Sequence, residues 1–94
     1  MNEIFPQGHA WIDGNFVALA EAKISILDWG FLRSDATYDV VHVWKGRFFR
    51  LDNHIDRFFE STRKLRMPCK MDRDELKKIL AGCVEKAKLE NAYV

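Results

Sequence analysis

Apolar and polar positions follow different periods in the two halves of the chain. From His9 to Leu51 the apolar residues form short runs separated by glycine, asparagine or charged residues, which is typical of strands and turns. From Asp52 to Ala87 they recur every three or four residues, which is typical of amphipathic helices. The sequence therefore predicts an α+β fold, in which a small antiparallel β-sheet of hairpins packs with two helices.

Two hairpins are predicted in the first half. The first turns at Asp13-Gly14-Asn15, because these residue types tolerate the positive φ of a tight turn. The second runs from Tyr38 to Leu51 and turns at Lys45-Gly46. Between the hairpins, Ile24-Ser25-Ile26 predicts a further short strand that ends at a loop, Asp28-Trp29-Gly30.

The strand that begins at Tyr38 carries candidate pocket residues. Alternation with period two places Tyr38, Val40 and His42 on one face of this strand, and Asp39 and Val41 on the other. A phenol, an aliphatic side chain and an imidazole on one face can line a pocket. From the pattern alone, an ordinary half-buried sheet face is the simpler explanation.

Two helices follow, and the sequence predicts their ends. Asp52 is predicted to cap the first helix, which runs to about Arg66 and ends before Pro68. Asp72 is predicted to cap the second, and Asn91 to end it in a left-handed conformation. The apolar stripes are Ile55, Phe58, Phe59, Thr62 and Leu65 in the first helix, and Leu76, Ile79, Leu80, Cys83, Val84 and Ala87 in the second.

A strand pattern starts again at Ala92-Tyr93-Val94. A strand start without a partner adds little stability and exposes an edge. We therefore expect residues 1–94 to be one domain of a longer chain, which continues beyond this strand.

Composition and charge narrow the class of protein. Hydrophobic residues make up 48% of the 94 residues, as in ordinary globular domains, and no apolar run is long enough to span a bilayer. The net charge of +1 gives no general attraction to nucleic acid or to a membrane surface. Met1–Pro6 lacks the features of a secretory signal, and Cys69 and Cys83 form no disulfide framework, so we expect a cytoplasmic protein.

The search for a phosphate-binding residue leaves five candidate arginines, namely Arg33, Arg50, Arg57, Arg63 and Arg66. His9, His42 and His54 lack the spacing of metal ligands, so no metal site is expected, and no glycine-rich phosphate loop is present. A phosphate can also be held by a single arginine, whose planar fork matches phosphoryl oxygens. Arg57, opposite the apolar stripe of the first helix, is the main candidate, although solvent exposure is the usual state of such a side chain.

Four segments resemble the N-terminal domain of class IV aminotransferases. They are the loop ISILDWGF (24–31), the hairpin SDATYDVVHVWKGRFFRL (34–51), the helix start DNHIDR (52–57) and the following STRKLR (61–66), in the order of that family. The resemblance covers about Ala10 to Val94. It implies the N-terminal domain of the D-amino-acid-aminotransferase-like fold, a pyridoxal 5'-phosphate cofactor, amino acid or amine and 2-oxo acid substrates, and a homodimer.

The resemblance also implies roles for individual residues. Arg57 matches the arginine that holds the cofactor phosphate. Tyr38, Val40 and His42 match the substrate-binding wall, and Arg33 matches a loop arginine that reaches the neighbouring subunit's site. The lysine that forms a Schiff base with the cofactor lies downstream in the family, so residues 1–94 are expected to be inactive alone and to contain no catalytic residue.

The choice of reaction stays open within the family. Asp39-Val-Val-His-Val-Trp44 stands where branched-chain members have a more glycine-rich run, which favours the D-amino-acid and (R)-amine transaminase branches. One alternative is an aminodeoxychorismate lyase-like enzyme on the same fold. Another is a non-catalytic α+β binding module.

Overall fold

The computed structural model describes residues 7–67 and 69–94. Two features used above lie outside the described residues, namely the Met1–Pro6 segment examined for a secretory signal and Pro68 after the first helix. Within the described ranges, no helix is both long enough and apolar enough to cross a membrane.

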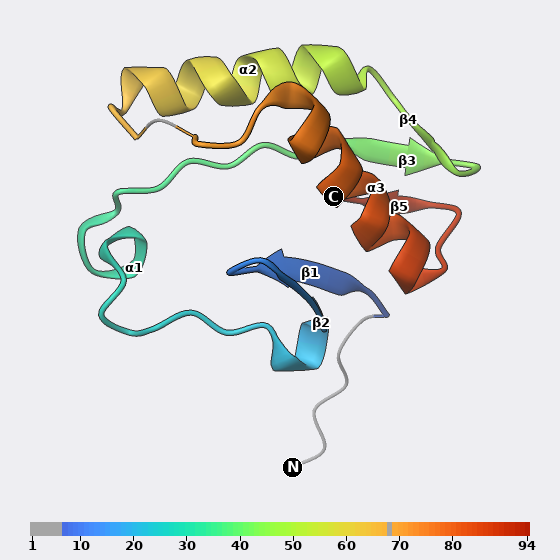
Figure 1. Ribbon diagram of the computed structural model, residues 1–94, viewed down its shortest axis with the longest axis horizontal. Helices are drawn as coiled ribbons and strands as arrows, with labels where there is room; N and C mark the ends of the chain where they lie inside the picture. The colour runs from blue at the N-terminus through green and yellow to red at the C-terminus, as the bar shows by residue number, and fades with distance from the viewer. Residues whose placement is uncertain (1–6, 68) are drawn as a thin grey trace.

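The fold is α+β with two small antiparallel sheets (Figure 1). The first sheet pairs β1 with β2, and the second has the order β4-β3-β5. The predicted fold class is confirmed, with two sheets in place of one and a short additional helix. The elements are β1 (His9–Ile12), β2 (Asn15–Ala18), the 3-10 helix η1 (Leu19–Glu21), α1 (Trp29–Arg33), β3 (His42–Trp44), β4 (Arg47–Phe48), α2 (Leu51–Lys64), α3 (Arg73–Ala87) and β5 (Ala92–Tyr93).

Both predicted hairpin turns are present. Asp13 and Gly14 have φ of 51° and 85°, and Lys45 and Gly46 have φ of 50° and 76°. Two successive positive φ angles are the hallmark of type I′ turns, whose twist matches that of the flanking strands. Glycine at the second position of each turn adopts this conformation without a steric penalty.

The strand β3 is the centre of the second sheet. Val43 pairs with Phe48 of β4 on one side and with Ala92 of β5 on the other, and its side chain is fully buried. Just before β3, the backbones of Val41 and Val94 exchange two hydrogen bonds of 2.9 Å. The strand predicted at the end of the chain is therefore confirmed, and it has a partner in β3.

The helices and the first hairpin surround a small core. Figure 1 shows α2 running along one side of the molecule and α3 lying between α2 and the β1–β2 hairpin. On α3, Gly82 leaves room for the ring of Phe16 from β2, because a Cβ at this position would lie 2.6 Å from the ring's Cζ. The buried apolar residues are Val41, Val43, Ile55 and Ala87.

The helix α2 begins two residues earlier than predicted. Arg50, with φ of 55°, occupies the N-cap position without a side-chain cap, so the prediction that Asp52 caps this helix is wrong. Asp52 lies in the first turn, where its negative charge interacts favourably with the helix dipole. Its carboxylate instead pairs with Arg73 and Lys77, and thereby ties α2 to α3.

The end of α2 has a local cause. The amide of Met67 donates to the carbonyl of Thr62 at 2.9 Å, and the amide of Arg66 donates to that of Arg63 at 3.0 Å. Arg66 itself is left-handed, with φ of 56°. This pattern is a Schellman motif, which ends the helix at Lys64 rather than at the predicted Arg66.

The prediction for α3 is correct at its N-terminus and wrong at its C-terminus. Asp72 caps the helix as predicted, because its Oδ1 accepts a hydrogen bond of 2.9 Å from the amide of Glu75. At the other end Lys88, with φ of 56°, is the left-handed cap. The prediction that Asn91 ends this helix is therefore wrong, since its side chain contacts the backbone of Lys45.

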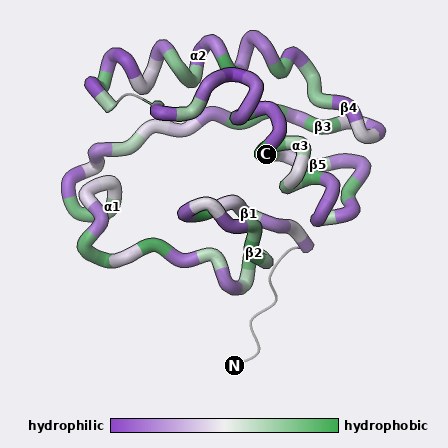
Figure 2. The backbone as a smooth tube through the Cα atoms, in the orientation of Figure 1, coloured by the Kyte–Doolittle hydropathy of each residue, from purple (hydrophilic) through white to green (hydrophobic). Residues whose placement is uncertain are grey.

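The connection between η1 and β3 is largely irregular. The strand predicted at Ile24-Ser25-Ile26 is absent, and the two isoleucines are 66% and 75% exposed because no other strand pairs with this segment. The predicted loop at Asp28 is instead the start of α1, whose Gly30 amide donates to the Asp28 carboxylate. Figure 2 shows several hydrophobic segments along this connection.

Candidate functional site

One carboxylate organises the polar contacts beside α2. Oδ2 of Asp39 accepts a hydrogen bond from Nε of Arg57 at 2.6 Å, and Oδ1 accepts one from Nη2 of the same guanidinium at 2.7 Å. Oδ1 also lies 2.9 Å from Nδ1 of His54 and 2.8 Å from the amide of Val40. Three of these contacts fall on Oδ1 and one on Oδ2, so both oxygens of Asp39 are engaged.

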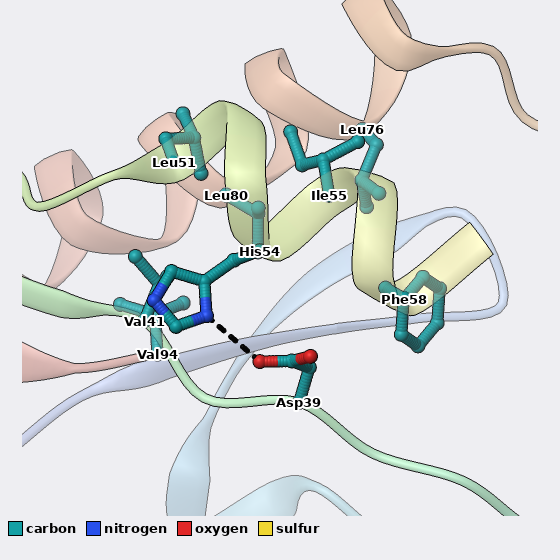
Figure 3. Close-up of a pocket in the computed structure, with 9 residues that line it drawn as sticks. All are labelled: Asp39, Val41, Leu51, His54, Ile55, Phe58, Leu76, Leu80 and Val94. Atoms are coloured by element: carbon teal, nitrogen blue, oxygen red, sulfur yellow. Dashed lines mark hydrogen bonds and ion pairs between the residues drawn. The ribbon is translucent and has the colours of Figure 1, made fainter. Parts of the chain in front are cut away.

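The sequence places the two partners of Asp39 on one helix face. His54 and Arg57 are three residues apart in α2, and side chains at this spacing are neighbours on a helix surface. Asp39 comes from the extended segment before β3. Its contact with His54 is drawn in Figure 3, at the edge of a pocket below α2. The cluster therefore joins this segment to the first turns of the helix.

The electrostatics of the cluster fix its protonation. Hydrogen bonds from Arg57 are the main cause that holds the pKa of Asp39 well below its usual value, against the opposing effect of burial. The same contact raises the pKa of Arg57. Because the ionised carboxylate can only accept, Nδ1 of His54 carries the proton. Nη2 of Arg57, 3.2 Å from Nδ1, then faces another donor and makes no hydrogen bond with it.

Arg57 also lines a shallow open hollow on the surface, together with Tyr38, Asp39, Val40 and Ser61. The side chain of Arg57 is 66% exposed. Among residues 7–67 and 69–94, none makes a hydrogen bond to its Nη1. A guanidinium with a free N–H edge is suited to bind phosphate or carboxylate oxygens.

A second pocket lies between α2, α3 and the end of β5 (Figure 3). Its only polar lining side chains are Asp39 and His54, which lie at one edge. Such a wall cannot neutralise a phosphate. The remaining lining residues are apolar: Val41, Leu51, Ile55, Phe58, Leu76, Leu80 and Val94.

The structure brings only some of the predicted site residues together. Tyr38, Val40 and Arg57 line the same hollow. His42 lies apart on β3, where its ring stacks on that of Tyr93 with centroids 4.9 Å apart. Arg33 is on α1 with its guanidinium over the ring of Trp29, 4.4 Å from the centroid.

The strand face proposed for Tyr38, Val40 and His42 does not form. The strand β3 begins only at His42, so Tyr38 and Val40 precede it in irregular backbone. Tyr38 is 85% exposed. Alternation therefore gave the wrong reason for placing these residues together, although Tyr38 and Val40 do share the hollow with Arg57.

Two residues of this region were missed by the sequence analysis. Asp39 was assigned to the face opposite Tyr38, and its partners lie 15 and 18 residues away, beyond the reach of any local pattern. Ser61 could have been found, because it lies four residues after Arg57 and hence on the same face of the helix.

Metal and thiol chemistry find little support in the described ranges. Over residues 7–67 and 69–94, no three side chains of His, Cys, Asp or Glu are grouped so that they could hold a metal ion. Burial raises the pKa of the Cys83 thiol, which lowers its share of the nucleophilic thiolate.

Comparison with known proteins agrees with the sequence resemblance. The sequence model of class IV aminotransferases matches residues 36–94. The chain is 27% identical over 84 residues to a Methanocaldococcus jannaschii protein provisionally named branched-chain-amino-acid aminotransferase, with 89% of this chain and 29% of that protein covered.

Two bacterial relatives carry a different name. A D-alanine aminotransferase of Listeria monocytogenes is 31% identical over 83 residues, which cover 88% of this chain and 29% of that protein. One of Staphylococcus aureus is 26% identical over 84 residues, which cover 89% and 30%. The chain thus spans about three-tenths of the length of the curated relatives it matches.

Proposed function

Since the chain belongs to the class IV aminotransferase family, we propose that it is part of an enzyme that transfers an amino group between an amino acid or amine and a 2-oxo acid. In this proposal residues 1–94 are the N-terminal small domain, and Arg57 holds the phosphate of pyridoxal 5'-phosphate. The observation that carries the proposal is the free Nη1 edge of Arg57, which belongs to the wall of an open polar hollow.

The donors present in the hollow fit a phosphate. Arg57 supplies a positive charge, and the Ser61 hydroxyl and the Tyr38 phenol supply further hydrogen-bond donors on the same wall. The carboxylate of Asp39 pairs with Nε and Nη2 of Arg57, so it weakens the attraction of the hollow for a phosphate but leaves the Nη1 edge open. Bound in this way, pyridoxal 5'-phosphate would supply an electron sink, while the residues of this chain anchor and orient it.

Of the four residues with a proposed substrate contact, two line the hollow beside Arg57 and two do not. Tyr38 and Val40 line the hollow with Arg57, which supports the proposal that they contact a substrate held next to the phosphate anchor. For His42 and Arg33 the substrate contacts remain predictions from the family resemblance. We further propose that the cofactor lysine lies outside residues 1–94, and that the complete gene product is a cytoplasmic homodimer.

The proposed amino donor is a D-amino acid. Two of the relatives described above are named D-alanine aminotransferases, and the run from Asp39 to Trp44 lacks the glycines typical of branched-chain members. Amino-donor profiling of the complete gene product tests this choice. Turnover of D-alanine supports it, whereas activity only with L-branched donors contradicts it. Formation of pyruvate from aminodeoxychorismate, without transfer to a 2-oxo acid, would instead identify a lyase.

The phosphate anchor is tested by comparing two cofactor forms. Binding of pyridoxal 5'-phosphate and of pyridoxal, which lacks the phosphate, is titrated by absorbance in the complete gene product. We expect Arg57→Ala to weaken binding of the phosphate form by at least about tenfold, as for one lost charge-assisted contact, and to leave pyridoxal binding unchanged.

The matched control for this experiment is Arg63→Ala. Arg63 is an exposed arginine on the same helix, and it pairs with Glu60 rather than with Asp39. We expect this variant to bind both cofactor forms as the wild type does. Equal selectivity for the phosphate form in Arg57→Ala and in the wild type would refute the assignment of Arg57.

A further inference from the structure

We infer that Asp39 is a positioning residue for Arg57, which fixes the guanidinium so that its Nη1 edge stays available to the phosphate. The inference rests on the proposed phosphate role of Arg57. It adds a second residue, from a different segment of the chain, to the binding of the cofactor phosphate.

The geometry of the pair supports this role. Nε and Nη2 of Arg57 contact different oxygens of Asp39, at 2.6 and 2.7 Å. Two such contacts fix the plane of a guanidinium as well as its position, which a single contact cannot do. Once both nitrogens are engaged, Nη1 is the edge of the group left over for another anion.

The carboxylate is the rigid partner. The side chain of Asp39 is 11% exposed and that of Arg57 66% exposed. Asp39 is also held from other directions, by the amide of Val40 and by Nδ1 of His54. An exposed arginine ordinarily loses rotamer freedom when it binds a ligand. An arginine that is already fixed to a largely buried carboxylate has lost that freedom before the phosphate arrives.

The negative charge of Asp39 also opposes the binding of a phosphate. This charge lies within the same hollow and repels a phosphate. Removal of this charge would therefore strengthen phosphate binding if Asp39 did nothing but compete for Arg57. Removal would weaken binding if positioning is the larger effect, so the direction of the change distinguishes the two cases.

A purely structural role predicts a third result. If the contact only ties the segment before β3 to α2, its loss lowers the stability of the protein without changing the preference of the folded molecules for a phosphate. The ratio of the dissociation constants for pyridoxal and pyridoxal 5'-phosphate reports this preference. Overall loss of folded protein does not change the ratio.

The experiment measures that ratio in variants of the complete gene product. Asp39→Asn keeps the size of the side chain and removes its charge. We expect it to weaken binding of the phosphate form by about tenfold and to leave pyridoxal binding unchanged, as for the loss of one charge-assisted contact. The control is Asp35→Asn, at an exposed aspartate that makes no ion pair with the described residues, and it should behave as the wild type.

A second variant serves if Asp39→Asn does not fold. Arg57→Lys keeps the positive charge at an exposed position but cannot contact two carboxylate oxygens in a fixed plane. We expect the same loss of preference for the phosphate form. Where Asp39→Asn does fold, the double variant should show no further loss. Preference as in the wild type for Arg57→Lys would overturn the inference.

The outcomes distinguish the positioning role of Asp39 from the proposed phosphate role of Arg57. Unchanged or tighter phosphate-form binding in Asp39→Asn, combined with a loss in Arg57→Ala, overturns the positioning role and leaves Arg57 as the anchor. Unchanged preference in Arg57→Ala overturns the proposed phosphate anchor itself. Loss in Arg57→Ala, Arg57→Lys and Asp39→Asn supports both.

Discussion

Oδ1 of Asn91 accepts a hydrogen bond of 3.0 Å from the backbone amide of Lys45, 46 residues earlier in the chain. The next amide, of Gly46, donates to the carbonyl of Glu90 at 2.8 Å. The turn between β3 and β4 is therefore supported by the segment that follows α3. Asn91 lies three residues after the left-handed Lys88 that ends α3, and its side chain supports the β3–β4 turn instead.

Replacement of Asn91 should loosen this turn. Asn91→Ala removes the acceptor for the Lys45 amide, and we expect it to cost about 1 kcal/mol of stability. We also expect the Lys45 amide to exchange faster with deuterium, as measured by NMR. Asn91→Asp keeps an acceptor oxygen and serves as the control. Equally slow exchange in Asn91→Ala would show that the side chain does not protect this amide.

The first hairpin should be sensitive to its glycine. Gly14 has φ of 85°, and a Cβ at this position would meet no atom within 4 Å. The cost of Gly14→Ala is therefore a backbone cost, which we expect to be about 1–2 kcal/mol in urea denaturation. Asparagine tolerates left-handed backbone better, so Gly14→Asn should lose less. The same loss in both variants would argue against strain as the cause.

The small core should respond to the loss of a single methylene. Ile55 is 2% exposed, whereas Ile26 is 75% exposed. We expect Ile55→Val to lower the free energy of unfolding by about 1 kcal/mol, and Ile26→Val to change it by less than about 0.5 kcal/mol. Urea denaturation of both variants makes the comparison, and equal effects would contradict the observed difference in burial.

Acid should weaken the contact between Asp39 and its partners. The pKa of Asp39 is lowered in the folded protein, mainly by hydrogen bonds from Arg57. The carboxylate therefore contributes stability that is fully present well above its unfolded pKa of about 4, and that is lost as the pH falls below this value.

Urea midpoints at pH 7, 5 and 3.5 check this dependence. The wild type should lose more stability than Asp39→Asn between pH 5 and pH 3.5, because the variant lacks the titrating group. The comparison is needed because contacts with Lys77 and Arg63 lower the pKa of two exposed carboxyls, Asp52 and Glu60, in both proteins. Parallel curves would show that the Asp39 carboxylate adds no stability of its own.

Local signals in the sequence predicted the elements well. Glycine in the two turns and Asp72 before α3 act within a few residues, so the chain needs no distant partner for these features. The alternation at Ile24-Ser25-Ile26 failed for the opposite reason. A strand needs a neighbour that supplies hydrogen bonds, and no neighbour lies beside this segment.

The candidate site depended more on distant contacts. The family resemblance pointed to Arg57, but no periodicity could show that Asp39 accepts its hydrogen bonds across 18 residues. The position of His42 likewise depends on a distant residue, because its ring stacks on that of Tyr93 in β5. Arg33 contacts the ring of Trp29 in α1, a helix that the sequence analysis did not predict.

The pairing of β3 with β5 has a consequence for the order of folding. Val43 and Ala92 are partners in the sheet, yet all of α2 and α3 lies between them in the chain. Helices of this length form from local contacts in about a microsecond, whereas the ribosome needs about 2–10 s to add the intervening residues. During synthesis the β3 edge of the β3–β4 hairpin therefore stays unpaired until both helices have been made. Only then can β5 pair with β3 and complete the sheet.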